Sequence, residues 1–231
     1  MNLYPQRRVL LFVFALFLLA SFAPLLAQSS PAALPSPQVE NRKTSTPYTG
    51  DLSIFDSPGR DERLQVNRVM DILAIAPGKH VADIGAGSGW FTVRAARRVG
   101  DAGIVYAVDI NPEAIHYITD RIQKENLRNV TAILSDSDDA LLPPDSVDAV
   151  LLLKTYHEVA KPQTLMRNLR AALRPGAKIG IIDRNGNAEN HGVAREVVEQ
   201  EVAASGYELT AQYDFVKGDN MDYFLVFAVK P

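Results

Sequence analysis

A strand that runs directly into closely spaced glycines constrains the fold of this chain more than any other feature. Residues 80–84 have the composition of a buried β-strand, Gly85, Gly87 and Gly89 follow, and a helical pattern begins at Trp90. Because glycine has no Cβ atom, the backbone of such a turn can approach a ligand closely, and the free N–H groups at the helix start face that ligand. The pattern predicts a cofactor-binding turn in an α/β fold.

A carboxylate ends the second predicted strand. Residues 104–109 form an apolar run, and Asp109 comes about twenty residues after the last glycine of the turn. In open α/β sheets an acidic side chain at this place accepts hydrogen bonds from ribose hydroxyls, and charge-assisted hydrogen bonds of this kind are strong. We therefore expect the ligand to be a nucleoside.

The glycine spacing separates different kinds of nucleotide site. A dinucleotide-binding turn reads G-x-G-x-x-G, but Trp90 stands where its third glycine would belong. A Walker-type phosphate loop is excluded as well, because no Gly-Lys-Ser/Thr follows. The segment from Asp83 to Thr92 instead resembles motif I of the class I S-adenosylmethionine-dependent methyltransferases.

Further matches to this family follow in its order, over roughly residues 64–229. Asp109 falls at the second, acidic motif, residues 135–138 at the third, residues 144–150 at the fourth strand, and residues 173–176 at the turn before the fifth. The resemblance implies S-adenosylmethionine as cofactor. It also implies that Asp83 holds the methionine ammonium, Asp109 the ribose and Asp136 the adenine amino group. The cofactor-binding residues that it implies are Asp83, Gly85, Ala86, Gly87, Gly89, Asp109, Ile110, Asp136 and Ser137.

Strand–helix alternation predicts an α/β fold, a single Rossmann-like, doubly wound domain. We expect a helix around residues 66–73 before the sheet, helices after the glycines and around Ile115–Ile122, a helix striped by Leu165, Leu169 and Leu173, and one over 193–204. The expected strands cover 80–84, 104–109, 130–134, 147–153, 178–182, 208–215 and 223–229. The last pair matches the antiparallel C-terminal strand of the methyltransferase fold, so the seven-stranded sheet should be mostly parallel.

The fourth strand ends in a cluster of polar side chains, where parallel strands present their ligand crevice. His157 is the candidate base, because its unperturbed pKa lies near neutrality. Glu158 could orient His157 or replace it, and Tyr156 could contact the sulfonium or the substrate by a cation–π interaction. Alternatively, these side chains face water in a helix-cap loop. Asp183 and Arg184, after the fifth strand, are further pocket candidates.

The other histidines (His80, His116 and His191) are expected at the surface, and no metal site is expected. The chain contains no cysteine, which excludes zinc–thiolate sites and disulfides. Its formal net charge of −3 is poorly suited to nucleic acid, whose phosphates require basic patches.

Residues 1–27 have the layout of an export signal, with Arg7 and Arg8 ahead of an apolar run and a small residue at the end. An uncleaved membrane anchor is the alternative, and it would be the domain's sole membrane contact. Residues 28–50 are rich in Pro, Ser and Thr and predict a solvated linker, which leaves 51–231 for the domain. Both readings place the domain outside the cytoplasm, in the periplasm or at the cell envelope.

The predicted function is methyl transfer from S-adenosylmethionine to a small molecule, a lipid or a protein carboxylate. The family's Asn/Asp-Pro-Pro-Tyr/Phe motif for amide-like nitrogens is absent. Enzymes that methylate arsenic work through cysteines, so we do not expect an arsenic acceptor. Two alternatives stay open: a non-catalytic nucleoside-binding module of the cell envelope, and an NAD-dependent oxidoreductase. The oligomeric state is not predicted.

Overall fold

The computed structural model describes residues 42–44, 48, 50–187 and 189–231. These residues belong to one compact unit that spans Val39–Pro231. The predicted leader (1–27) and most of the predicted linker (28–50) lie outside the described residues. Within the described part of the chain, none of the helices has both the length and the apolar character needed to span a bilayer.

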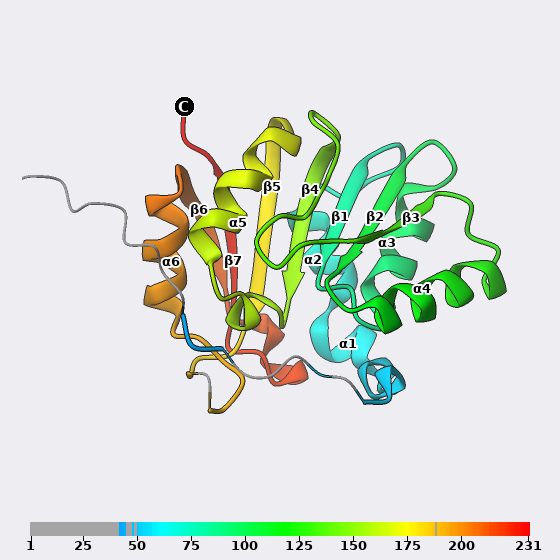
Figure 1. Ribbon diagram of the computed structural model, residues 1–231, viewed down its shortest axis with the longest axis horizontal. Helices are drawn as coiled ribbons and strands as arrows, with labels where there is room; N and C mark the ends of the chain where they lie inside the picture. The colour runs from blue at the N-terminus through cyan, green and yellow to red at the C-terminus, as the bar shows by residue number, and fades with distance from the viewer. Residues whose placement is uncertain (1–41, 45–47, 49, 188) are drawn as a thin grey trace, which may run out of the picture. The chain divides into compact units, whose positions relative to one another are not determined.

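The unit is built on one seven-stranded sheet (Figure 1). Its strands are β1 His80–Ile84, β2 Ile104–Asp109, β3 Val130–Leu134, β4 Val147–Leu153, β5 Leu173–Asp183, β6 Tyr207–Tyr213 and β7 Tyr223–Val229. They lie in the order β3-β2-β1-β4-β5-β7-β6. The first five pair in parallel, and β7 pairs antiparallel with both β5 and β6. The predicted mostly parallel α/β sheet with an antiparallel C-terminal strand is confirmed.

Helices cover both faces of the sheet (Figure 1). They are α1 Arg60–Leu64, α2 Val66–Ile72, α3 Trp90–Val99, α4 Pro112–Lys124, α5 Pro162–Leu169 and α6 Arg195–Ala204. The first three share a buried cluster with Val81 and Val105, and α4 extends this layer over β2 and β3. On the opposite face, α5 and α6 pack against Val150 and Leu152. The result is a three-layer arrangement with hydrophobic core on each side of the sheet.

The central strand β4 shows why the sheet needs both helix layers. Ala149 and Leu151 belong to one core, whereas Val150 and Leu152 belong to the other, and all four are buried. Successive side chains of a strand point to opposite faces, so a continuous apolar run becomes a strand buried on both sides. This composition suits β4 to its place in the middle of the sheet.

The structure differs from the predicted elements at two places. Leu173 was expected on the helix that contains Leu165, but it pairs with Val147 and begins β5, and the pairing shifts register before Ala149. The sixth strand was expected to reach 215, but it ends at Tyr213, because residues Phe215–Asp219 turn into a 3-10 helix. Long-range pairing and local turns set these boundaries, which periodicity alone does not report.

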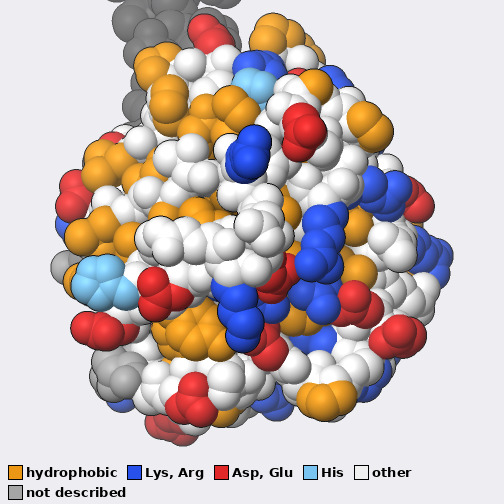
Figure 2. All heavy atoms as spheres, turned by 90° about the vertical axis from the view of Figure 1, so that its right-hand side faces the viewer, with side chains coloured by type: hydrophobic (Ala, Val, Ile, Leu, Met, Phe, Trp, Pro, Cys, Tyr) orange, Lys and Arg blue, Asp and Glu red, His pale blue; other side chains and the backbone are white. Residues whose placement is uncertain are grey.

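Charges of both signs are interspersed on the molecular face that includes α4 and β3 (Figure 2). The carboxyl ends of the parallel strands lie at another end of the sheet. There, β1 lies beside β4, and the chain crosses over in opposite directions on the two sides of this pair. Such a switch point leaves a crevice, which is where open α/β sheets bind ligands.

Candidate functional site

A cavity of about 560 Å³ opens at the carboxyl ends of β1, β2 and β4. This volume falls in the range of small-molecule and cofactor sites. Its wall is formed by residues 83–88, 109–111, 135–137 and 153–155, by His157 and Glu158, and by Arg184 and His191. Side chains between Thr44 and Arg60 close it on another side. Nearly all predicted site residues therefore surround one space.

The glycine turn has the backbone conformation that only glycine adopts without strain. Gly85 and Gly87 have φ angles of 74° and 54°, and a Cβ atom on Gly85 would clash with the side chain of Thr155. The amides of Gly85 and Ala86 both donate to the carbonyl of Val108, at 2.8 and 3.0 Å. The turn is thereby held against β2, with its backbone exposed to the cavity.

Asp109 joins the glycine turn to the next loop. One carboxylate oxygen accepts a hydrogen bond from the Gly87 amide at 2.8 Å, and the other accepts from the Asn111 amide at 2.9 Å. Each carboxylate oxygen has a second lone pair, so the side chain keeps acceptor capacity for ligand hydroxyls. Ile110, which follows it, is exposed and also lines the cavity.

Asp83 is the buried acid of the site. It is 2% exposed and accepts a 2.6 Å hydrogen bond from the Thr92 hydroxyl. Burial raises the pKa of Asp83 from 3.8 to about 6, the hydrogen bond from Thr92 opposes this rise, and the charge of Asp109 adds to it. A ligand ammonium group would stabilise the ionised form of this carboxylate.

Three other predicted cofactor residues lie in different surroundings. Asp136 and Ser137 are exposed on the cavity wall, in a turn where the Asp136 amide donates to the Asp139 carbonyl. Gly89 is outside the described lining of the cavity. It precedes α3 and packs next to Ile118 of α4, so its role in the structure is helix packing.

His157 is buried and held by Asp183. The Asp183 carboxylate lies 2.8 and 3.0 Å from Nδ1, and it also accepts from the His157 amide at 3.1 Å. Asp183 ends β5 and is fully buried, so it holds the imidazole ring in a fixed orientation. The opposite ring nitrogen, Nε2, lies 3.2 Å from a Glu158 oxygen.

His191 extends this chain of polar groups to the surface. Its Nδ1 lies 3.3 Å from the same Glu158 oxygen, its ring is edge-on to that of His157, and its side chain is 57% exposed. The sequence offered no signal for this contact, since a lone histidine in a polar loop resembles any surface histidine. The expected surface position is correct, yet His191 also lines the cavity.

Tyr156 lies in the hydrophobic core rather than on the described cavity wall. It is fully buried, and the guanidinium of Arg42 lies 5.2 Å from its ring centroid. Burial raises the pKa of Tyr156 well above its ordinary value, and the nearby charge of Glu201 adds to the rise. This position supports the loop that presents His157, and it does not reach the cavity.

The segment before the sheet is part of the site, although the sequence pattern placed the domain start at residue 51. Arg42 forms an ion pair with Glu201 at 2.9 Å, and its backbone amide donates to Ala160. Tyr48 lines the cavity, as do apolar residues of the 3-10 helix η1 (Leu52–Asp56). The apolar residues at 52, 54 and 55 were the available signal for this packing.

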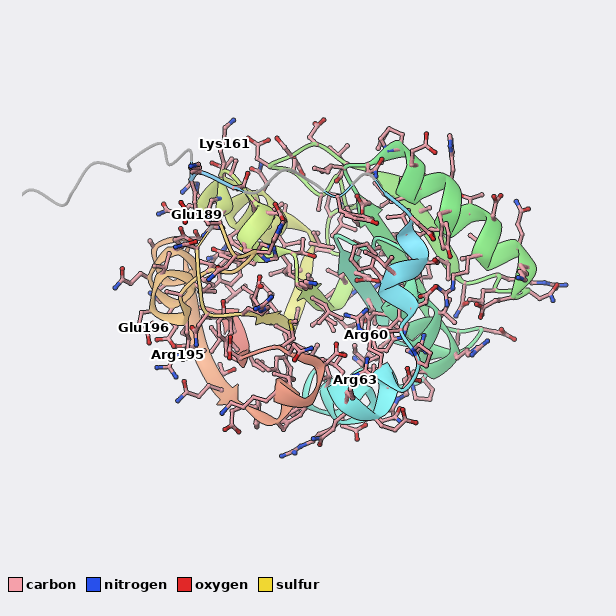
Figure 3. All side chains as sticks on the ribbon, turned by 90° about the horizontal axis from the view of Figure 1, so that it is seen from below. Arg60, Arg63, Lys161, Glu189, Arg195 and Glu196 are labelled. Atoms are coloured by element: carbon pink, nitrogen blue, oxygen red, sulfur yellow. The ribbon has the colours of Figure 1, made fainter. Side chains whose placement is uncertain are left out.

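Two ion pairs hold η1 and α1 next to the cavity. Asp56 receives hydrogen bonds from Ser88 in the glycine turn and from Arg121 of α4, at 2.9 and 2.8 Å. Arg60 pairs with Asp219 at 2.9 Å and lies 4.3 Å from the Trp90 ring centroid. Figure 3 looks onto this end of the molecule and shows η1 and α1 lying across it, with Arg60 at their junction.

Comparison with known proteins places this site in context. The model of a methyltransferase domain family matches residues 75–225, which is more than half of the 231 residues. In solved structures, the fold is similar to that of a SAM-dependent methyltransferase from Aquifex aeolicus. The TM-score is 0.70 at 23% identity, and the match covers 77% of this chain and 96% of that one.

Curated relatives match over shorter stretches. The chain is 30% identical over 136 residues to an arsenite methyltransferase of Halobacterium salinarum, covering 59% of this chain and 35% of the relative. It is 29% identical over 113 residues to a protein-L-isoaspartate O-methyltransferase of Pyrococcus horikoshii, covering 49% and 48%. The chain therefore spans about half or less of the length of these relatives.

Proposed function

This chain belongs to the methyltransferase domain family, and from that membership we propose that it transfers a methyl group from S-adenosylmethionine to an acceptor bound beside His157. The observation that carries this proposal is the shared cavity. It joins the glycine turn, Asp109 and the 135–137 loop to the polar cluster after β4. A cofactor and an acceptor can therefore meet in one space.

The cofactor is assigned by the chemistry of the wall. The bare backbone of the glycine turn can approach the methionine moiety, with Asp83 as partner for its ammonium. Asp109 retains acceptor capacity for the ribose hydroxyls, and Asp136 and Ser137, which the resemblance assigns to the adenine, line the same cavity. The dinucleotide alternative has less support, because Trp90 occupies the position of the third glycine and is packed between Arg60 and Arg94.

The chemical step is an in-line displacement. A lone pair of the acceptor forms the bond to the methyl carbon, while the carbon–sulfur bond breaks and its electron pair stays on sulfur. Alignment of the reacting atoms can lower such a barrier by roughly 7–11 kcal/mol. An acceptor that ionises during the reaction would lose its proton to the His157–Glu158 cluster, where Asp183 fixes the imidazole.

The acceptor end of the cavity favours a small polar molecule with a hydroxyl or carboxylate group. Lys154 and Arg184 line the cavity together with Glu158 and the two histidines, so two permanent cations stand beside the single acidic group of this cluster. One curated relative is named as an arsenite methyltransferase. An arsenic acceptor has no thiolate to bind it here, because the chain lacks cysteine.

The direct test is a calorimetric titration of the full chain with S-adenosylhomocysteine, and with NAD as the competing candidate. We expect one S-adenosylhomocysteine per chain and no NAD binding. The opposite selectivity would overturn the proposal. Binding without transfer to any of a panel of hydroxyl and carboxylate acceptors would instead support the non-catalytic module.

A further inference from the structure

Three potential metal ligands converge at the acceptor end of the cavity. One donor atom each from His157, Glu158 and His191 lie within 4.8 Å of one another. The closest approaches join one Glu158 oxygen to His157 Nε2 at 3.2 Å and to His191 Nδ1 at 3.3 Å. A tetrahedral zinc site with bonds of about 2.0–2.2 Å would place its ligand atoms roughly 3.4 Å apart.

The buried carboxylate behind His157 fixes which nitrogen is available. A carboxylate only accepts hydrogen bonds, so Nδ1 of His157 is occupied by its contact with Asp183, and Nε2 is the ring nitrogen directed toward Glu158. Metal-binding histidines are commonly oriented in this way, with the second ring nitrogen donating to a carboxylate. Asp183 makes the same kind of contact here and is itself fully buried.

The geometry of the three atoms suits a shared cation. One Glu158 oxygen lies 3.2 Å from His157 Nε2 and 3.3 Å from His191 Nδ1, so a single ion placed among them can contact all three groups. The same distances also fit hydrogen bonds from imidazole N–H groups to this oxygen, and the titration described below separates the two arrangements.

We propose that His157, Glu158 and His191 bind a divalent transition-metal ion such as Zn²⁺. Two imidazoles and a carboxylate suit zinc and other divalent transition-metal ions, whereas Mg²⁺ and Ca²⁺ prefer oxygen ligands alone. All three residues line the cavity, so a fourth position faces the acceptor, as in catalytic zinc sites with three protein ligands. This proposal departs from the expectation, drawn from the sequence, that the chain has no metal site.

The inference rests on the proposed function and specifies its acceptor. An acceptor oxygen at the fourth position would release its proton to water and attack the methyl group as an oxyanion, because a bound cation lowers the pKa of its ligand. The methyl group then bonds to this oxygen, and sulfur keeps the electron pair of the broken bond. His157 would act as a ligand rather than as the base.

The test uses the full chain after removal of metals with a chelator. Co²⁺ is titrated in as a visible-light probe of coordination, and Zn²⁺ is then added to displace it. We expect one Co²⁺ per chain, full displacement by Zn²⁺, and affinity reduced about tenfold or more in both His191→Ala and Glu158→Gln. His116→Ala removes an exposed histidine of α4 and should leave binding unchanged.

S-adenosylhomocysteine binding is measured on the same samples, so that the two proposals can fail separately. Absence of Co²⁺ binding with intact S-adenosylhomocysteine binding would overturn the metal site alone. It would identify the cluster as a hydrogen-bonded chain. Co²⁺ binding that survives in both His191→Ala and Glu158→Gln would also overturn it. Absence of S-adenosylhomocysteine binding in the native protein, both before metal removal and after metal is restored, would contradict the proposed function itself.

Discussion

At the scale of single residues, the Asp109 carboxylate has a structural role and a proposed role in ligand binding. It accepts hydrogen bonds from the Gly87 and Asn111 amides, and it also lines the cavity. We predict that Asp109→Ala weakens S-adenosylhomocysteine binding by about 1–3 kcal/mol, the usual cost of losing charged hydrogen bonds. Calorimetry measures the change, and Asp120→Ala on the exposed side of α4 is the control. Equal affinity of native protein and Asp109→Ala would contradict the ribose assignment.

Asp83 makes the stability of the unliganded protein depend on pH. Burial raises the pKa of Asp83 from 3.8 to about 6, so the folded state binds a proton more tightly than the unfolded state. The stabilisation that comes from this tighter proton binding is fully present below pH 3.8 and is lost as the pH rises through about 6. The free energy of unfolding changes by roughly 3 kcal/mol over this range. Ionised Asp83 therefore destabilises the empty site at neutral pH.

Asp83→Asn should remove this penalty. We predict that the difference in melting temperature, variant minus native protein, increases between pH 4 and pH 7. Thermal unfolding without ligand measures this difference. Its S-adenosylhomocysteine affinity should fall at pH 7, because the negative partner of the ammonium is gone. A melting-temperature difference that stays constant across this range would show that burial does not raise the pKa of Asp83.

At the scale of elements, η1 and α1 cover the cavity through a few polar contacts. Asp56 joins η1 to Ser88 and Arg121, and both partners lie on segments that contribute residues to the cavity wall. We predict that Asp56→Ala increases amide hydrogen exchange in residues 50–60 by about 5- to 150-fold, the equivalent of 1–3 kcal/mol. Exchange in the strands should not change.

Asp101→Ala is the matched control, because Asp101 is an exposed acid in the turn before β2. An equal increase of exchange in both variants would mean that the contact with Arg121 does not hold η1. The ring of Trp90, the single tryptophan of the chain, offers a second readout. It lies beside Arg60, so its fluorescence should shift when α1 moves.

At the scale of the whole molecule, we propose that residues 1–27 direct the domain out of the cytoplasm. The basic start and apolar run are the support for this proposal. We predict that the full chain expressed in bacteria is recovered from the periplasmic or envelope fraction, and that a chain lacking residues 1–27 stays in the cytoplasm. Fractionation with immunoblotting measures this, and recovery of both chains from the cytoplasm would contradict it.

Export raises the question of cofactor supply, because S-adenosylmethionine is made in the cytoplasm. Mass spectrometry of the exported protein for nucleosides that remain bound addresses this question. Bound S-adenosylmethionine or S-adenosylhomocysteine would support a functional cofactor site outside the cytoplasm. A different nucleoside would redirect the proposed function.

The sequence by itself determined the features that depend on neighbouring residues. Strands β1 to β4, the glycine turn, and the position of Asp109 at a strand end follow from apolar periodicity and from the conformational freedom of glycine. The order of these elements also predicted the sheet type, since strand–helix–strand units cross over with one hand.

Only the tertiary structure decided which distant residues meet. Asp183 reaches His157 because β5 pairs with β4, and His191 reaches Glu158 because the loop after β5 turns back over the cavity. Arg42 and Asp56 attach the N-terminal segment in the same way. These contacts depend on long-range strand pairing and packing, which local patterns do not encode, and they turn separate candidate residues into a single site.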